Sequence, residues 1–525
     1  MSNFSTTQTV TKRVTPTRGG IVAAQHRKAA EVGAAILEAG GDAIDAAVAT
    51  SFAIGVVEPW MSGPAGGGTM MIWREAEQKA YTLFFGMRSP KALDPKDYPL
   101  DGSGRSSDLF PWPTVKDDRN VQGATAIAVP GTVAGMELAH QTFGTLSWKE
   151  LLAPAVGLAK EGMLVDWFAS LMISSSTRDL AKDADSASLF LEDGQWPRIA
   201  GWTALSDTRL DQSRLAATLE RLADAGARDF YEGEIARAMV ADIQAKGGCL
   251  GLDDLKAYKA ELRDTIAVPY RGGTIHASKG LTAGPNLADC LAMMQESFEP
   301  GTEPDGKSYA AMAAALTAAY EKRLKGMGDL DAPHAPSCTT HFSVVDRHGN
   351  MVAVTQTLLS IFGSKVISPS TGLLMNNGIM WFDPEPGKPN SLGPDKGCLM
   401  NVCPAIGEKD GRRFAIGASG GRKILPAVLN LTSFMTDFDM DLGEAFHQPR
   451  IDNTGGGTIV ADEDLSPGII AALDAVLPTA TAKRTVFPYA FACPAGVARE
   501  NGLNTGCTEI MSPWGDAITE KEKTH

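Results

Sequence analysis

Residues 338–358 constrain the fold more than any other stretch of this 525-residue chain. They read CTTHFSVVDRHGNMVAVTQTL, two runs rich in β-forming residues separated by a polar segment at 346–350. This pattern predicts a β-hairpin with a five-residue turn. Pairing at equal distances from the centre of that turn places Val345 opposite Met351.

The same register places Thr339, at the start of the first strand, opposite Thr357. Their Cβ atoms would lie roughly 5 Å apart, so two hydroxyl groups would face each other. An N-terminal-nucleophile hydrolase needs such a strand, because chain cleavage between Cys338 and Thr339 would free an α-amine to act as a base. The alternative is an ordinary hairpin in which threonine is simply a good strand former.

Charge and composition favour a small-molecule client. The formal charge is −14 and no Lys/Arg-rich run offsets it, which argues against nucleic acid or an anionic membrane as a partner. Residues 1–20 lack the apolar core of a secretory signal, and the most apolar run, 43–57, is too short to span a bilayer. We therefore expect a cytoplasmic protein.

The cysteines predict neither a disulfide framework nor a metal site. There are seven, an odd number spread thinly over the chain, which suits reduced thiols in a reducing compartment. The closest pair, Cys398 and Cys403, has no histidine nearby. We expect no metal and no cofactor.

Hydrophobic periodicity predicts helices over much of the chain. The first covers 26–39 and stops at Gly40-Gly41, and Asp42 caps a second that runs to Val57. A strand at 69–73 follows. The remaining predicted helices cover 130–140, 148–161, 210–225, 231–246 and 308–325.

A second chemical motif lies at 413–434, which predicts a strand, a turn over 418–422 and then a helix. In one interpretation the turn is an oxyanion site. The amides of Gly420 and Gly421 would lie at the N-terminus of the helix, where the positive end of its dipole stabilises negative charge.

In the competing interpretation, residues 417–421 form the Gly-x-Ser-x-Gly elbow of a serine hydrolase, with Ser419 as nucleophile. Asp437 or Asp452 and then His447 follow in the required order. The elbow would lie near the end of the chain, without the preceding alternation of strands and helices that such a fold has. Asp441 and Glu444, which precede His447, predict the cap of a short helix.

Five blocks in order resemble the γ-glutamyltransferase family of N-terminal-nucleophile hydrolases, from about Gly20 to at least Asp452. They are ILEAGGDAIDAAVATSFAIGVVEPWMSGPAGGG, AVPGTVAGMELAHQTFGTLSWKELLAPAVGLAKEG, FYEGEIARAMVADIQAKGGCLGLDDLKAYKAE, TTHFSVVDRHGNMVAVTQT, and GASGGRKI with EAFHQPRID. The resemblance implies an α+β fold, a four-layer αββα sandwich. It also implies a proenzyme that cuts itself before Thr339 into a large chain, 1–338, and a small chain, 339–525.

The resemblance further implies roles for individual residues. Thr339 would be the nucleophile for self-cleavage and for attack on a substrate amide, and its freed α-amine would be the general base. Thr357 would orient and polarise it, and the amides of Gly420 and Gly421 would hold the oxyanion. The two chains of one precursor would be mutual partners, and the processed heterodimers could associate further.

The substrate-recognition positions depart from the family pattern. The family's Phe-Arg-Glu-x-Ala-Pro is Phe-Gly-Met-Arg-Ser-Pro here, so Arg88 is displaced by two residues but stays on the same face of a strand. Asn377 and Asn401 are the other candidate substrate-binding residues. The family's polar residues are replaced at Gly86, Leu359, Gly378, Trp381 and Met400.

Three functions remain open at this stage. The first is hydrolysis of γ-glutamyl groups of glutathione-like amides through an acyl-Thr339 intermediate, with transfer to an amine undecided. The second is an acylase of the cephalosporin-acylase type, or another amidohydrolase, acting on a less polar amide by the same mechanism. The third is a non-catalytic relative that binds a ligand without cleaving itself.

Overall fold

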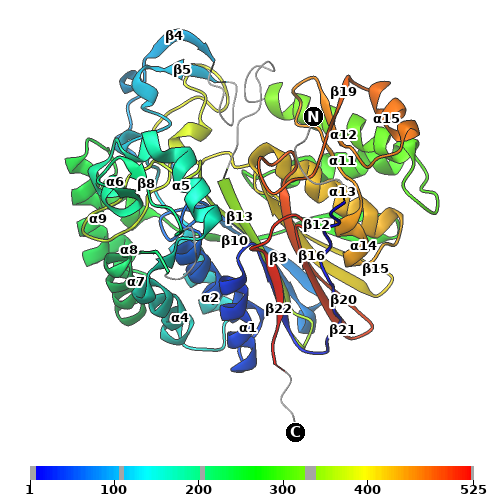
Figure 1. Ribbon diagram of the computed structural model, residues 1–525, viewed down its shortest axis with the longest axis horizontal. Coiled ribbons are helices and arrows are strands. Elements are labelled where there is room, and N and C mark those ends of the chain that lie inside the picture. The colour runs from blue at the N-terminus through cyan, green and yellow to red at the C-terminus, as the bar shows by residue number, and fades with distance from the viewer. Residues whose placement is uncertain (1–6, 106–111, 202–206, 326–337, 522–525) are drawn as a thin grey trace.

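Two antiparallel sheets form the centre of the molecule (Figure 1). The computed structural model describes residues 7–105, 112–201, 207–325 and 338–521. The seven-stranded sheet has the order β10 (Glu261–Asp264), β3 (Lys79–Phe85), β2 (Gly67–Arg74), β14 (Met351–Leu359), β13 (Cys338–Val345), β1 (Ile21–Ala24) and β22 (Asp516–Thr519). The six-stranded sheet has the order β11 (Ile266–Tyr270), β12 (Gly273–Ala277), β15 (Ala405–Lys409), β16 (Arg412–Ser419), β20 (Cys493–Glu500) and β21 (Leu503–Thr508).

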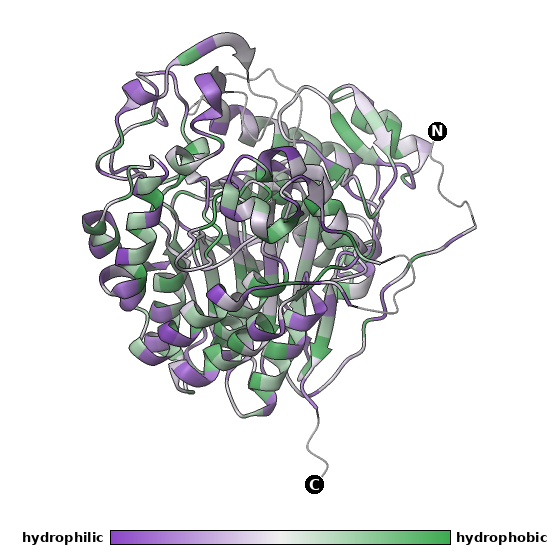
Figure 2. Cartoon of the chain, turned by 60° about the vertical axis from the view of Figure 1, so that its left-hand side comes forward, coloured by the Kyte–Doolittle hydropathy of each residue, from purple (hydrophilic) through white to green (hydrophobic). Residues whose placement is uncertain are grey.

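The alternation of side chains along each strand builds two separate cores. On β13, Phe342 and Val344 pack toward the helices, whereas Val345 packs between the sheets. The inter-sheet core also receives Trp73 from β2 and Val497 from β20. In Figure 2 hydrophobic residues lie along these central strands. Both faces of the seven-stranded sheet are therefore buried around β13.

Helices cover the outer face of each sheet, which confirms the predicted four-layer αββα sandwich. The helices packed on the seven-stranded sheet and on one another are α1 (Arg27–Glu38), α2 (Ala43–Val57), α3 (Thr132–Phe143), α4 (Trp148–Glu161), α7 (Ser213–Ala225), α8 (Asp229–Glu232), α9 (Glu234–Ala245) and α10 (Leu252–Ala257). Those on the six-stranded sheet are α11 (Gly284–Ser297), α12 (Gly306–Lys325), α13 (Ile424–Asp437), α14 (Leu442–His447) and α15 (Pro467–Asp474).

Smaller elements surround this sandwich. Helices α5 (Trp167–Leu180) and α6 (Ala184–Phe190) pack in a cluster of their own beside α2. The short strands are β4 (Leu100–Arg105), β5 (Pro113–Val115), β6 (Met163–Leu164), β7 (Leu191–Glu192), β8 (Trp196–Pro197), β9 (Arg209–Leu210), β17 (Ile451–Asp452), β18 (Ile459–Asp462) and β19 (Thr479–Ala482). Among the described residues, no helix is long and apolar enough to cross a membrane.

Most predicted helices are present, with one interruption. The helix predicted over 231–246 is divided into α8 and α9 at Gly233. The Asp229 carboxylate accepts hydrogen bonds from the backbone N–H groups of Glu234 and Ile235, so it caps a new helix where the sequence predicted continuity. The predicted Asp42 cap of α2 is confirmed.

Both predicted chains of the precursor contribute strands to both sheets. The segment before Thr339 supplies β1, β2, β3 and β10 to one sheet and β11 and β12 to the other, and the segment after it supplies the rest. The division into 1–338 and 339–525 stays a prediction. In this fold the strands of the two pieces would alternate within the same two sheets, so the pieces would not be separate domains.

A buried histidine makes the sandwich sensitive to acid. His341 lies on β13 between the sheets, bonded to Thr355 and Ser343, and a Cβ on Gly417 would lie 2.3 Å from its ring. Burial lowers the pKa of His341 from 6.5 to about 3.

Below pH 6.5 His341 therefore binds a proton in the unfolded chain but not in the folded chain. The folded state loses stability as the pH falls toward 3. We expect the free energy of unfolding, measured in urea, to decrease over that range, and to decrease less in His341→Gln. The exposed His348→Gln is the control and should keep the wild-type slope. Equal slopes in all three proteins would contradict this account.

Candidate active site

The two threonines of the hairpin meet as the sequence predicted. The β13–β14 register runs from Val345 opposite Met351 to Thr340 opposite Gln356. The Thr339 hydroxyl donates to Oγ1 of Thr357 at 3.3 Å, and both residues are buried. A bulge between Cys338 and Thr340 shifts the register at this point. A bulge changes the direction in which a side chain points, and this one lies at Thr339, the predicted nucleophile.

The backbone after β14 holds the Thr357 hydroxyl in place. The Leu359 N–H donates to Thr357 Oγ1 at 2.8 Å. Leu359 has a φ of 91°, a conformation that costs a non-glycine residue free energy and is retained only where the surroundings impose it. The strain and the hydrogen bond together orient this hydroxyl toward Thr339.

Asn377 is hydrogen-bonded to the same turn. Its Oδ1 accepts from the Ser360 N–H at 3.0 Å, and its Nδ2 donates to the Ser360 hydroxyl and to the Val121 carbonyl. The whole amide is thus used within the protein. The substrate-binding role of Asn377 stays a prediction, and what the structure places there is a brace for the loop beyond Thr357.

The glycine turn follows β16. The predicted strand, turn and helix are present, but the strand is longer than predicted and includes Ala418 and Ser419. Gly420 has a φ of 133° and Gly421 a φ of 59°, and α13 begins three residues later. Both conformations favour glycine, which explains the residue pair at this turn.

A hydrogen-bonded bridge links the glycine turn to the threonine strand. Gln25, directly after β1, donates through Nε2 to the Ser419 hydroxyl at 2.7 Å. Its Oε1 lies 3.3 Å from the hydroxyl of Thr340, the neighbour of Thr339. The bridge therefore connects the residue before Gly420 with the residue after Thr339.

The serine-hydrolase interpretation finds no support in this geometry. Ser419 is hydrogen-bonded to Gln25 and lies at the end of a strand in an antiparallel sheet. Nε2 of His447 accepts from the Lys12 N–H, and its Nδ1 bonds the Gly443 carbonyl. Asp437 binds Arg271 in a buried ion pair.

The arginine predicted to bind substrate is already paired. Arg88 donates from Nε to Oδ1 of Asp395 at 2.7 Å and from Nη2 to its carbonyl at 2.6 Å, and its side chain is 47% exposed. The sequence separation of these partners hid this pair from sequence reasoning. Substrate binding by Arg88 stays a prediction.

Asn401, in contrast, has an unused donor. Its Oδ1 accepts from Arg323 at 3.1 Å, but its buried Nδ2 has no partner among the described residues. Arg323 is itself buried, and it donates to two backbone carbonyls and two side-chain amide oxygens, all of which are neutral. Burial lowers the pKa of Arg323 to about 10. This corner of the site is therefore electropositive.

An apolar cluster occupies several of the positions at which this chain lacks the family's polar substrate-recognition residues. Leu359, Trp381 and Met400 pack together with Met87 and Phe382. A Cβ on Gly86 would lie 2.5 Å from Cζ of Phe84 and 2.9 Å from the Met400 methyl group, so a larger residue there would displace these two side chains. Sequence reasoning identified these positions one by one, and the fold brings them together.

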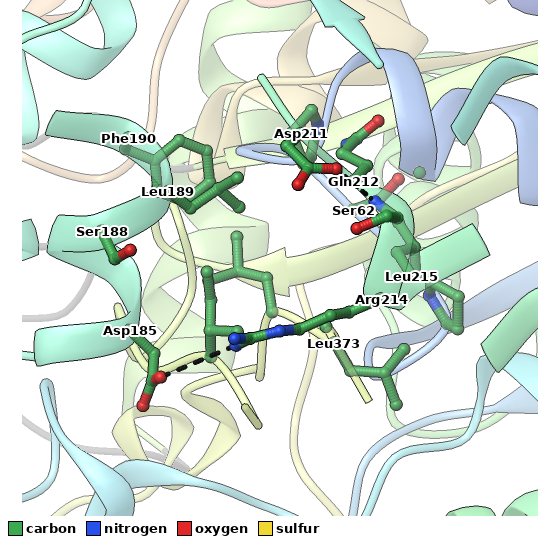
Figure 3. Close-up of a pocket in the computed structure, with 18 residues that line it drawn as sticks. Ser62, Asp185, Ser188, Leu189, Phe190, Asp211, Gln212, Arg214, Leu215 and Leu373 are labelled. Carbon is green, nitrogen blue, oxygen red and sulfur yellow. Dashed lines mark hydrogen bonds and ion pairs between the residues drawn. The ribbon is translucent and has the colours of Figure 1, made fainter. Parts of the chain in front are cut away.

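A separate cavity of about 190 Å³ lies behind the strand that carries Thr357. Ser62 lines it and also accepts a hydrogen bond from Gln356, the residue before Thr357. Figure 3 shows its ion pair between Arg214 and Asp185, with 3.9 Å between Nη1 and Oδ1. Neither Thr339 nor Thr357 lines this cavity.

No metal centre is evident among the described residues, which contain no cluster of three His, Cys, Asp or Glu side chains. The six described cysteines form no disulfide. The side chain of Cys338 lies outside the described residues.

Comparisons with known proteins identify the family of the chain. The Gamma-glutamyltranspeptidase family model matches residues 29–338 and 331–490. The acylase ACY 1 proenzyme of Pseudomonas sp. strain V22 is 34% identical over 494 residues, 86% of each chain. The glutathione hydrolase proenzyme of Escherichia coli K12 is 30% identical over 483 residues, 82% of this chain and 80% of that one.

The fold also matches a solved structure. The crystal structure of cephalosporin acylase from Bacillus halodurans has a TM-score of 0.83 at 24% identity over 99% of both chains. The family match and the relatives show that the chain is an N-terminal-nucleophile hydrolase, and its fold is consistent with this class. The chain belongs to the gamma-glutamyltranspeptidase family, which confirms the resemblance carried by the five sequence blocks. Its named relatives are proenzymes, the organisation expected of a precursor cut into two chains.

Substitution of Gly420 should strain the glycine turn. A Cβ there would lie 3.0 Å from the Ala492 Cα in addition to adopting a positive φ. We expect Gly420→Ala to lower the free energy of unfolding by about 1 kcal/mol more than Gly387→Ala, because a tight backbone contact adds to the conformational cost.

Gly387 is a matched control, because it has a φ of 84° with open space around its Cβ direction. Denaturant unfolding of both variants measures the difference. Equal destabilisation would show that Ala492 does not restrict the turn.

Proposed function

We propose that the chain is a self-processing amidohydrolase that uses Thr339 as its nucleophile. The observation that carries this proposal is the 3.3 Å contact between the hydroxyls of Thr339 and Thr357, beside a glycine turn with two positive φ angles. An N-terminal threonine with a positioned partner hydroxyl and an adjacent oxyanion site has the parts that acyl transfer needs.

Self-cleavage would begin with attack of Thr339 Oγ1 on the carbonyl carbon of Cys338. The C–N bond of that peptide breaks as the new ester bond forms, and the Thr339 nitrogen takes up the hydroxyl proton. Water then hydrolyses the ester. The products are a carboxylate at Cys338 and a free amine at Thr339.

The freed amine would act as the base in substrate turnover. It accepts the Oγ1 proton as the oxygen attacks the substrate carbonyl carbon, and it later gives that proton to the departing amine. The N–H groups of Gly420 and Gly421 would stabilise the oxyanion of the tetrahedral intermediate. Water, or an acceptor amine, then resolves the acyl-Thr339 ester.

For the acyl group, our first candidate is γ-glutamyl, as in glutathione-like amides. The glutathione hydrolase relatives support it, and so does the electropositive corner formed by Arg323 and Asn401, which suits an acyl group that carries a carboxylate. Arg88 and Asn377 would act as further substrate-binding residues only if the pairings described above rearrange.

The second candidate is a less polar acyl amide, as in an acylase. The apolar cluster at Leu359, Trp381 and Met400 favours it, because a buried ammonium or carboxylate group costs several kcal/mol without a charge partner. The acylase ACY 1 relatives give it equal support.

We further propose that the processed pair resides in the cytoplasm, a location supported by the odd number of cysteines. We also propose that the processed heterodimers associate with one another.

Replacement of the nucleophile should abolish processing. We expect Thr339→Ala to remain a single full-length band on a denaturing gel, whereas the wild-type protein yields two bands whose smaller member begins at Thr339. N-terminal sequencing of that band tests the cleavage site directly.

Ser419→Ala is the control, and it should still yield both bands after long incubation, because Ser419 is not the proposed nucleophile. If Thr339→Ala is still cleaved, Thr339 is not the nucleophile. If the wild-type protein remains uncleaved after long incubation, the result supports the third function, a non-catalytic relative that binds a ligand.

Substrate choice can be measured with paired chromogenic anilides. On a γ-glutamyl anilide and a glutaryl anilide, we expect Asn401→Ala to reduce kcat/KM about 10-fold or more, because an acceptor of the substrate would lose its buried donor, the Asn401 Nδ2. Turnover of the γ-glutamyl anilide by the wild-type protein favours the first candidate. Turnover only of the glutaryl or an aliphatic anilide favours the acylase.

A further inference from the structure

A row of buried polar side chains joins the strand of Thr339 to the glycine turn. Glu58 follows α2, Thr340 lies on β13, Gln25 follows β1, and Ser419 ends β16. Each is less than a tenth exposed. Four separate segments thus contribute one side chain each. Two of these residues, Thr340 and Ser419, are the immediate neighbours of Thr339 and Gly420 in sequence.

The orientation of the Gln25 amide is fixed by its neighbours. Its Nε2 lies 2.6 Å from the carbonyl of Cys493 and 2.7 Å from the Ser419 hydroxyl. A carbonyl can only accept, so the nitrogen must face it and Oε1 must face Thr340. Oε1 therefore needs a hydrogen from the Thr340 hydroxyl, 3.3 Å away.

The hydrogen count then determines the state of Glu58. The Thr340 hydroxyl has one hydrogen but two acceptors in reach, Gln25 Oε1 and, at 3.1 Å, Glu58 Oε2. Both contacts are hydrogen bonds at once only if one acceptor supplies a hydrogen of its own. An amide oxygen cannot do so, whereas a carboxylic acid can.

We propose that Glu58 is a positioning residue which, as a neutral carboxylic acid, completes the array Glu58–Thr340–Gln25–Ser419 and thereby fixes Thr339 against the Gly420–Gly421 turn. The inference rests on the proposed function of Thr339. In the complete array each hydroxyl and amide has a partner, which is the condition under which a buried polar network rigidifies a structure.

The surroundings of Glu58 favour the neutral form. Burial raises its pKa from 4.5 to about 8. The titratable groups that face it are the Asp166 carboxylate before α5 and the Cys493 thiol at the start of β20, and neither offers a positive charge. Above pH 8 the ionised carboxylate would draw the Thr340 hydroxyl to itself and leave Gln25 Oε1 without a donor.

Glu58→Gln is the first test, because glutamine keeps both a donor and an acceptor at every pH. The wild-type protein should lose self-cleavage rate and kcat as the pH rises through about 8, at unchanged KM. Glu58→Gln should match the wild-type protein at pH 7 and keep its activity above pH 8. A pH profile equal to that of the wild-type protein would overturn the proposal.

Gln25→Glu is the second test, since it replaces only the donor that faces Ser419 and Cys493. We expect kcat to fall about 10²-fold with little change in KM, the scale of a small misplacement of reacting groups. Gln212→Glu is the matched control. Gln212 is as buried, and its amide also donates to a carbonyl, that of Val56. A decrease no larger than that of the control would overturn the proposal.

A stability measurement separates the failure of this inference from failure of the proposed function. The unfolded chain ionises Glu58 near pH 4.5 and the folded chain near 8, so this group should lower the free energy of unfolding as the pH rises from 6.5 to 8, above the range in which His341 titrates. Glu58→Gln should remove this dependence even in a protein that neither cleaves itself nor turns over an anilide. If Gln25→Glu fails to fold, the pH profiles of Glu58→Gln decide the matter, and an unchanged stability profile contradicts a neutral Glu58.

Discussion

The pairing of β13 with β14 is the contact on which the rest of the site depends. A hairpin joins neighbours in sequence, so its register is set locally, by the turn and by the alternation of Phe342 and Val344 with the residues between them. A slip of one residue would move these side chains to the wrong face and separate Thr339 from Thr357. The burial of both faces of the sheet therefore protects the geometry of two hydroxyl groups.

The second sheet supplies what the hairpin lacks. Gly420 and Gly421 lie beyond the end of β16, and their distance from Thr339 depends on how the two sheets are stacked. Apolar packing between sheets is not directional, and it tolerates small shifts. The Gln25 and Glu58 array adds directional contacts at the end of the stack where such shifts would matter.

Sequence reasoning reached the parts of the site that are local. The two runs of β-forming residues in 338–358 predicted the hairpin, and residues 418–422 predicted the turn that contains Gly420 and Gly421. The contacts it missed join residues hundreds of positions apart, such as Arg88 with Asp395 and Gln25 with Ser419. Glu58 directly follows the predicted helix that runs to Val57, and nothing near it in the sequence indicates a threonine partner. Periodicity also gave no sign of the bulge at Thr339 or of the Asp229 cap that divides a helix.

The central position of β13 has a consequence for any cut made before Thr339. A break in a chain usually creates loose ends, and a break at the border of a sheet exposes backbone groups that recruit other molecules. Here the new amino terminus would start a strand already flanked by β14 and β1, with most of its backbone partners in place. The scission would change the covalent connectivity of the molecule while leaving its architecture intact, so a reactive amine could appear without any refolding.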